Sequence, residues 1–258
     1  MCGIVGTANW GDTKSLQQMN AVQRHRGPDD SGIWEHRTPD GTTTIGLASR
    51  RLAILDLSSD GHMPMTNQDG SVVITYNSEV YNFKELRQEL ISKGHTFRSQ
   101  TDTEVVLRLY EVEGPQCIRR LRGMFAFAIC DLRGANPKLI LARDHFGVKP
   151  LYYVQRGRQL AFASEAKSLF HLPGMNAEVD PDSLNKFLTF LWVPDPDTLF
   201  RGVKKLPAGH YAVFESGRFS LHEYWDLKFP PAEMKFPLSE AALAEEVRER
   251  FRESFVRR

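Results

Sequence analysis

Apolar residues recur along the chain at spacings that predict both strands and helices. Strands are predicted where short β-rich or apolar runs lie between turn-forming residues. The segments with this pattern are residues 71–76, 123–131, 138–142 and 151–153. In residues 82–93 and 102–111 the apolar positions recur at helical spacing, and Gly94 is placed to end the first helix. Short strands joined by glycine-rich turns favour an α+β fold in which helices cover antiparallel sheets.

The pattern changes after residue 226. Residues 227–237 carry three prolines and little periodicity, which indicates a linker. A strongly periodic helix is predicted from Ser239, with apolar residues four apart on one face, at Leu243, Val247, Phe251 and Phe255. Such a stripe needs an apolar partner. We therefore expect residues 1–226 to form one domain, and residues 227–258 to form a linker and the first helix of a truncated second domain.

Composition and charge exclude several classes of protein. Of the 258 residues, 41% are hydrophobic and 25% are charged, which is ordinary for a globular chain. Thirty-three basic and 32 acidic residues give a formal charge of +1, so no overall field favours a nucleic acid or an anionic membrane as partner. No secretory signal pattern and no run of membrane-spanning length is present, which makes the cytoplasm the expected location.

The cysteines are too few and too scattered for a disulfide framework or a paired-cysteine zinc site. They are Cys2, Cys117 and Cys130, and we expect free thiols. The histidines also lack a metal-binding spacing, and no Gly-Lys-Ser phosphate loop occurs. We therefore expect neither a metal nor a cofactor in this part of the protein.

Cys2 is the residue with the clearest candidate chemistry. Removal of Met1 would leave a thiol and a free α-amine on one residue. An α-amine titrates near pKa ~7.7 to 8.0 and a thiol near ~8.5, so the amine can accept the thiol proton near neutral pH. A cysteine at position 2 is by itself more often a small buried residue, and the flanking sequence decides between the two interpretations.

A series of motifs follows Cys2 in a characteristic order. The start, residues 2–6, predicts a strand that presents the terminus to a cleft. The further motifs are residues 26–29 (Arg-Gly-Pro-Asp), 51–56, 76–82, 101–104, 123–127, 142–144 with 147–153, 162–165, 206–210 and 224–225. Together they resemble class II glutamine amidotransferases, and in particular the glutaminase domain of the asparagine-synthetase branch. The resemblance implies the N-terminal-nucleophile (Ntn) hydrolase fold, a four-layer α/β/β/α sandwich of two antiparallel sheets.

The resemblance also implies catalytic roles. Cys2 would attack L-glutamine and release glutamate and ammonia. The developing oxyanion needs preorganised donors, which would be the side-chain amide of Asn77 and the backbone N–H of Ser78. Without its neighbours, Asn77 would be interpreted as a turn residue at the end of a strand.

Free glutamine carries two charged groups besides its amide. By the same resemblance, Arg51 would bind the α-carboxylate with its guanidinium fork, and Glu79 and Asp102 would face the α-ammonium. Taken singly, each of these could be a solvated surface charge. A nearby set, Arg26, Asp29, Arg143 and Asp144, is interpreted as structural, because buried Arg–Asp pairs often fix loops.

Ser78 departs from the family pattern, in which glycine is usual between the asparagine and the glutamate. Glycine serves where the backbone needs a positive φ or close approach to a ligand. A serine is therefore expected to bring backbone strain of about 1 to 3 kcal/mol, or a hydroxyl, into the oxyanion region.

The predicted activity is the glutaminase half of a larger enzyme. Ammonia would pass to a C-terminal synthetase domain that amidates aspartate and binds ATP and Mg²⁺. That domain's Ser-Gly-Gly-x-Asp-Ser loop does not occur in this chain. Three points stay open on sequence alone: an amidotransferase with another acceptor such as a sugar phosphate, a non-catalytic module that binds glutamine without cleaving it, and assembly as a homodimer.

Overall fold

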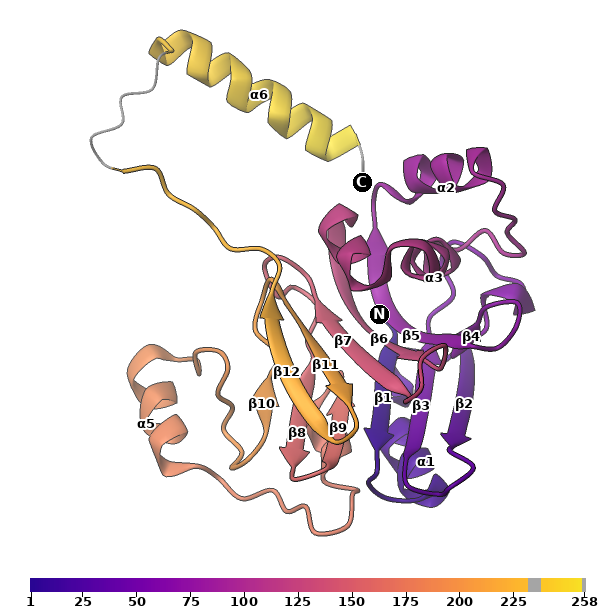
Figure 1. The fold of residues 1–258 in the computed structure, drawn as a ribbon. Helices are drawn as coiled ribbons and strands as arrows, with labels where there is room; N and C mark the ends of the chain where they lie inside the picture. Colours follow the sequence, from indigo (N-terminus) through magenta and orange to yellow (C-terminus); the bar gives the residue numbers. More distant parts are fainter. Residues whose placement is uncertain (232–237, 257–258) are drawn as a thin grey trace. The chain divides into compact units, whose positions relative to one another are not determined.

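Antiparallel strands build two six-stranded sheets in the described part of Met1–Trp225 (Figure 1). The computed structural model describes residues 1–231 and 238–256, so part of the predicted linker, residues 232–237, lies outside the described residues, as do 257–258. The strand order is β10-β8-β9-β1-β3-β2 in the first sheet and β12-β11-β7-β6-β5-β4 in the second. Neighbouring strands run antiparallel throughout the described part of both sheets, as expected from the short strands and tight turns.

The strands of the first sheet are β1 (Gly3–Ala8), β2 (Asp30–Arg37), β3 (Thr44–Arg51), β8 (Tyr152–Arg156), β9 (Gln159–Ala163) and β10 (Lys204–Lys205). Those of the second are β4 (Met65–Thr66), β5 (Val72–Val80), β6 (Gly123–Asp131), β7 (Lys138–Arg143), β11 (His210–Glu215) and β12 (Arg218–Glu223). The α-helices are α1 (Thr13–Ala21), α2 (Phe83–Ser92), α3 (Asp102–Glu113), α4 (Ala166–Leu169), α5 (Pro181–Phe190) and α6 (Glu240–Val256). Short 3-10 helices are η1 (Arg24–Arg26), η2 (Ser59–Gly61) and η3 (Gly114–Arg120).

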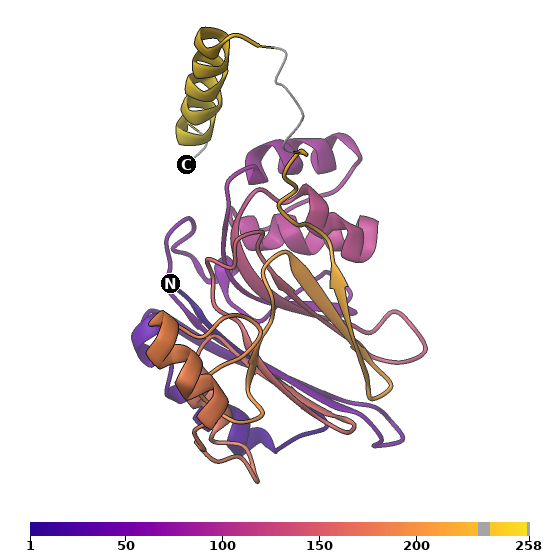
Figure 2. The same cartoon turned by 90° about the vertical axis from the view of Figure 1, so that its left-hand side faces the viewer.

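The apolar core has three layers of side chains, one between the two sheets and one on the outer, helix-covered face of each sheet. The central strands are therefore apolar on both faces. Along β1, Ile4 points into the space between the two sheets and Val5 points outward to α1 and α4. Along β6, Ala126 points between the sheets and Phe127 points outward to α2 and α3. Successive strand residues face opposite sides, so each central strand contributes to two cores. The layer order α/β/β/α is the predicted one (Figure 2).

The elements that were predicted lie within a few residues of the observed ones, with one informative error, but many elements were not predicted, among them β2, β3, β9, β11, β12, α1 and α5. The strand predicted at residues 71–76 continues as β5 to Val80, because Asn77, Ser78 and Glu79 pair with β6 in unbroken register. The polar side chains of these residues concealed the strand. Gly94 follows α2 with φ +91°, as expected of the residue that ends a helix.

Asp226–Arg258 forms a second unit, whose regular element is α6. The helix begins at Glu240, and Ser239 accepts a hydrogen bond from the backbone N–H of Ala242, as a capping residue does. Its apolar stripe is exposed, with Phe251 73% accessible. Among the described residues, no helix is long and apolar enough to cross a membrane.

Candidate active site

Cys2 lies directly before β1, a central strand of the first sheet, and its backbone carbonyl is hydrogen-bonded by Arg26. The Nε of Arg26 donates to the Cys2 carbonyl oxygen at 3.0 Å, and Arg26 is itself paired with Glu165 at 3.2 Å. The thiol lies against the residue that follows β3: Leu52 N–H donates to Sγ at 3.4 Å, and Sγ is 3.8 Å from the Leu52 carbonyl oxygen. The thiol therefore lies where the start of β1 pairs with the end of β3.

The surroundings of the Cys2 thiol combine burial with charges of both signs. Burial raises its pKa above the ordinary value, and this effect is opposed by the Leu52 N–H, the α-ammonium group of Met1 and Arg51. Asp102 raises the pKa further. A thiol whose pKa is raised needs a base before it can attack. The same interactions place Arg51 and Asp102 within electrostatic reach of Sγ.

Arg51, the last residue of β3, is 7% exposed and is held by the loop that follows it. Its Nη1 donates to the Ser58 carbonyl oxygen at 3.1 Å, and its Nη2 donates to the Asp56 carbonyl oxygen. Gly61 packs against the guanidinium so closely that a Cβ there would lie 2.0 Å from Nη2. A guanidinium carries five N–H donors, so these two bonds fix its position and leave donors for a ligand.

Asp102 is the first residue of α3 and is 5% exposed. Thr101 caps this helix by accepting from Glu104 N–H, and the Glu104 carboxylate in turn accepts from the backbone of residues 98 and 99. The Asp102 Oδ2 accepts from the Tyr76 hydroxyl at 2.7 Å and from Val80 N–H at 3.0 Å. Burial raises the pKa of the carboxyl, and these two hydrogen bonds oppose the shift.

Asn77 lies in the middle of β5 and is 1% exposed. Its Nδ2 has no hydrogen-bond partner among the described residues. A buried amide donor without a partner costs about 1 to 3 kcal/mol, so such groups are uncommon in folded proteins. The Asn77 amide is therefore free to donate to a negative charge that develops only during a reaction, such as an oxyanion.

Ser78 directs its backbone N–H away from the sheet. Tyr81 N–H bonds the Arg122 carbonyl oxygen on the β6 side, whereas Val80 N–H bonds Asp102 on the other side. Donors two residues apart along a strand point the same way, so Ser78 N–H faces the edge occupied by Asp102. Ser78 N–H thus faces the Asp102 edge of β5, and the Asn77 amide lacks a partner among the described residues.

The expected backbone strain at Ser78 was wrong. Ser78 is an extended residue of β5 opposite Phe125, and among the described residues other than glycine a positive φ occurs only at Asn9, Leu191 and Ser216. An extended backbone suits any residue. The hydroxyl does lie inside the site: it interacts weakly with the Tyr76 phenol and makes no well-formed hydrogen bond among the described residues.

Glu79 differs from the other predicted binding residues in its surroundings. It is an exposed residue, and its carboxylate forms an ion pair with the buried Lys149 at 3.3 Å. Asp102, in contrast, is buried and interacts electrostatically with the thiol. The structure thus joins Cys2, Arg51 and Asp102 electrostatically and places Glu79 in a separate pair at the exposed side of β5.

Three residues at the site were not assigned to it from sequence. Arg26, interpreted as structural, touches Cys2 itself; Tyr76 bonds Asp102; and Gly61 packs on Arg51. The first two lie within the quoted motifs, whose order was the signal that could have found them. Gly61 carries no sequence signal, because its importance arises from a contact across a loop.

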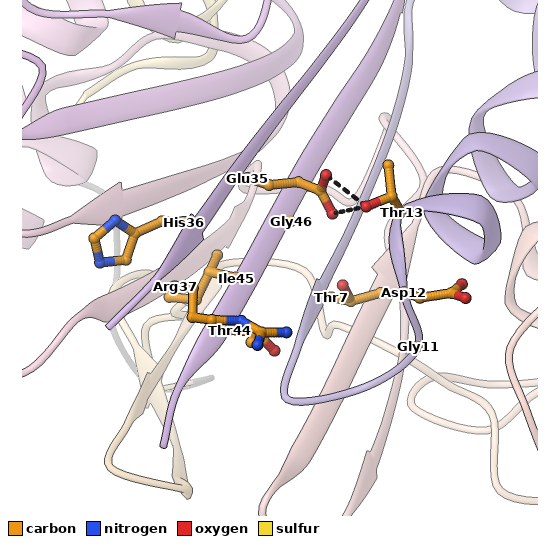
Figure 3. A pocket seen from close by; sticks show the side chains of 10 residues that line it. All are labelled: Thr7, Gly11, Asp12, Thr13, Glu35, His36, Arg37, Thr44, Ile45 and Gly46. Carbon is orange, nitrogen blue, oxygen red and sulfur yellow. Dashed lines mark hydrogen bonds between the residues drawn. The ribbon is translucent and has the colours of Figure 1, made fainter. Parts of the chain in front are cut away.

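A cavity of about 310 Å³ lies away from these residues, at the opposite end of β1 (Figure 3). Its lining includes Thr7, Thr13 and Glu35, and the Thr13 hydroxyl donates to the Glu35 carboxylate at 2.9 Å. Thr7 is five residues along β1 from Cys2, about 16 Å in an extended strand. The cavity is therefore separate from the candidate active site.

Comparison with known proteins gives matches over most of the chain. The family model described as "Glutamine amidotransferase domain" matches residues 1–225. Asparagine synthetase (glutamine-hydrolyzing) 1 of Bacillus subtilis (strain 168) is 38% identical over 259 residues, covering 96% of this chain and 38% of that protein. Asparagine synthetase (glutamine-hydrolyzing) 3 of the same organism is 34% identical, with 88% and 37% covered. The chain thus spans well under half the length of these relatives.

Solved structures share the fold at lower sequence identity. The glutamine phosphoribosylpyrophosphate amidotransferase from B. subtilis, complexed with ADP and GMP, superimposes with a TM-score of 0.62 at 18% identity. The match covers 87% of this chain and 49% of that one. At this identity the likeness concerns the fold alone, and it agrees with the two stacked sheets and their helices.

Proposed function

The chain belongs to the glutamine amidotransferase domain family, and on that premise we propose that it hydrolyses L-glutamine to glutamate and ammonia, with Cys2 as the nucleophile after removal of Met1. The observation that carries the proposal is the position of the Cys2 thiol, which accepts from Leu52 N–H at 3.4 Å directly after Arg51 and interacts electrostatically with the buried cation Arg51 and the buried anion Asp102. A free amino acid has one group to match each of them. A site of this kind favours glutamine over a neutral amide.

The chemistry follows from the groups around Sγ. The α-amine of Cys2 takes the thiol proton, directly or through water, and Sγ forms a bond to the side-chain carbonyl carbon of glutamine. The carbonyl oxygen becomes an oxyanion, which accepts from Asn77 Nδ2 and Ser78 N–H. The amine then protonates the leaving nitrogen, the C–N bond breaks, and ammonia departs from a thioester. Water attacks the thioester, the C–S bond breaks, and glutamate and the thiol are released.

Substrate binding would use the two buried charges. Arg51 has donors left for the α-carboxylate after its two loop hydrogen bonds. Asp102 would accept the α-ammonium, and Glu79 would add negative charge nearby while paired with Lys149. Because Asp102 is buried, an arriving cation also relieves part of the cost of burying its charge.

A glutamate-release assay on the processed protein tests the proposed function. Intact mass first establishes that Met1 has been removed. We expect glutamate and ammonia in equal amounts, with turnover that saturates with glutamine. A processed protein that binds glutamine and releases no glutamate would instead support the non-catalytic module.

We expect Gly61→Ala to raise KM for glutamine by about tenfold with little change in kcat. The new Cβ would lie 2.0 Å from Arg51 Nη2, so the guanidinium must move. Full truncation of one member of a buried charge pair costs about 2 to 5 kcal/mol, and displacement should cost less. Gly134→Ala is the matched control, because the nearest atom to its new Cβ is 3.6 Å away. Equal KM values for the two variants would contradict the assignment of Arg51 to the substrate.

The ammonia would be used by a synthetase domain C-terminal to this one. Two observations support this part of the proposal: the matched relatives are named asparagine synthetases and are more than twice as long, and α6 has an exposed apolar stripe. ATP and Mg²⁺ would bind that domain, and aspartate would be the acceptor. The longer protein should then form asparagine from glutamine, aspartate and ATP, whereas this chain alone should release free ammonia.

A further inference from the structure

The buried hydroxyl of Tyr76 makes one well-formed hydrogen bond among the described residues. The residue is 2% exposed, and its ring packs against Phe127 on the helix-covered face of β5, with ring centroids 6.3 Å apart. Its hydroxyl donates to Asp102 Oδ2 at 2.7 Å. The ring therefore belongs to the core, while the hydroxyl belongs to the proposed binding site.

The hydrogen bond from Tyr76 adds a second constraint on the orientation of the Asp102 carboxylate. Oδ2 receives two donors, the Tyr76 hydroxyl from one strand position and Val80 N–H from another. Two donors on one oxygen set the plane of the carboxylate, and a carboxylate has about four lone-pair sites, so acceptor capacity remains for a third donor. A buried carboxylate also needs such hydrogen bonds to stay ionised.

We propose that Tyr76 is a positioning residue for substrate selection: its hydroxyl holds Asp102 in the orientation that receives the α-ammonium group of glutamine. The inference rests on the proposed function, because it assumes that glutamine is the ligand. Tyr76 thereby contributes to recognition of an amino acid over a carboxylic acid of the same shape that lacks the amine.

The test separates this role from a packing role by means of a ligand analogue. Tyr76→Phe keeps the ring and removes only the hydroxyl. The matched control is Tyr110→Phe, since Tyr110 is equally buried, lies about 12 Å along α3 from Asp102 and donates to Asp131 at 3.0 Å instead of to a residue of the proposed site. Affinities are measured by calorimetry in the Cys2→Ala background for glutamine and for glutaramic acid, which has the amide and the carboxylate but no α-amino group.

We expect Tyr76→Phe to weaken glutamine binding about tenfold and to leave glutaramic acid unchanged, while Tyr110→Phe changes neither. In the active protein, KM should rise with kcat within about twofold of the wild type. Equal losses for both ligands, or no loss for glutamine, would overturn the inference. If the protein binds glutamine without turnover, the proposed function is contradicted, but the binding comparison still tests the role of Tyr76. If the protein binds no glutamine, the proposed function and the role of Tyr76 are both overturned.

Discussion

Replacing Cys2 by alanine should abolish glutamine hydrolysis and leave the fold intact. Loss of a catalytic nucleophile lowers kcat by about four orders of magnitude or more in other covalent hydrolases. Cys2 lies outside the regular part of β1 and is only partly buried, so a smaller side chain costs little packing. The variant should keep its circular dichroism spectrum and bind glutamine, with glutamate release at the background rate.

The other two cysteines provide matched controls. Cys117 and Cys130 are completely buried in apolar clusters, and burial raises the pKa of Cys130 to about 12 and that of Cys117 further. Neither can supply a thiolate at neutral pH. Cys117→Ala and Cys130→Ala should therefore keep full turnover and lose about 1 kcal/mol of stability. Turnover that survives in Cys2→Ala, or disappears in a control, would contradict the assignment.

Asn77→Leu should lower kcat by about 10² to 10³ without lowering stability. Removal of one oxyanion donor costs about 2.7 to 4 kcal/mol in the transition state. The side chains have similar shapes, and the Asn77 amide is a buried donor without a partner in the described structure. Replacing an unsatisfied polar group by an apolar one is neutral or stabilising. In Asn77→Leu, kcat should thus fall while the thermal stability rises or stays constant.

Asn67→Leu is expected to show the reverse behaviour. Asn67 is also buried, but its amide donates to Ser71 and Glu111 and its oxygen accepts from Val72 N–H. Its loss leaves those partners unsatisfied, so stability should fall by about 1 to 3 kcal/mol while kcat is retained. If Asn77→Leu behaved like Asn67→Leu, Asn77 would be a structural residue and a different oxyanion donor would be needed.

The layers of the fold were implied by the family resemblance, whereas local signals located only part of the helices and strands. Helices α2 and α3 have regular apolar spacing and identifiable ends, and β6 is a long buried strand. The strand β5 was predicted too short because Asn77 to Glu79 are polar, and only pairing with β6 reveals that they continue the ladder. Polar residues inside a buried strand break the local pattern where function requires them.

The candidate site was only partly predictable, because its details depend on contacts between distant residues. Motif order singled out Cys2, Arg51 and Asp102, but not that Tyr76 bonds Asp102 across 26 residues. The strain expected at Ser78 was wrong because the position is extended in this chain. Relief of strain therefore gives no reason to expect faster turnover from Ser78→Gly.

Covalent capture of the nucleophile would decide whether Cys2 performs the proposed reaction. The processed protein is incubated with a diazoketone analogue of glutamine, which alkylates a thiol with loss of nitrogen, and is then analysed by intact mass and peptide mapping. We predict a single adduct, located on Cys2, whose formation is prevented by excess glutamine. An adduct on Cys117 or Cys130, or no adduct at concentrations where glutamine binds, would contradict Cys2 as the nucleophile.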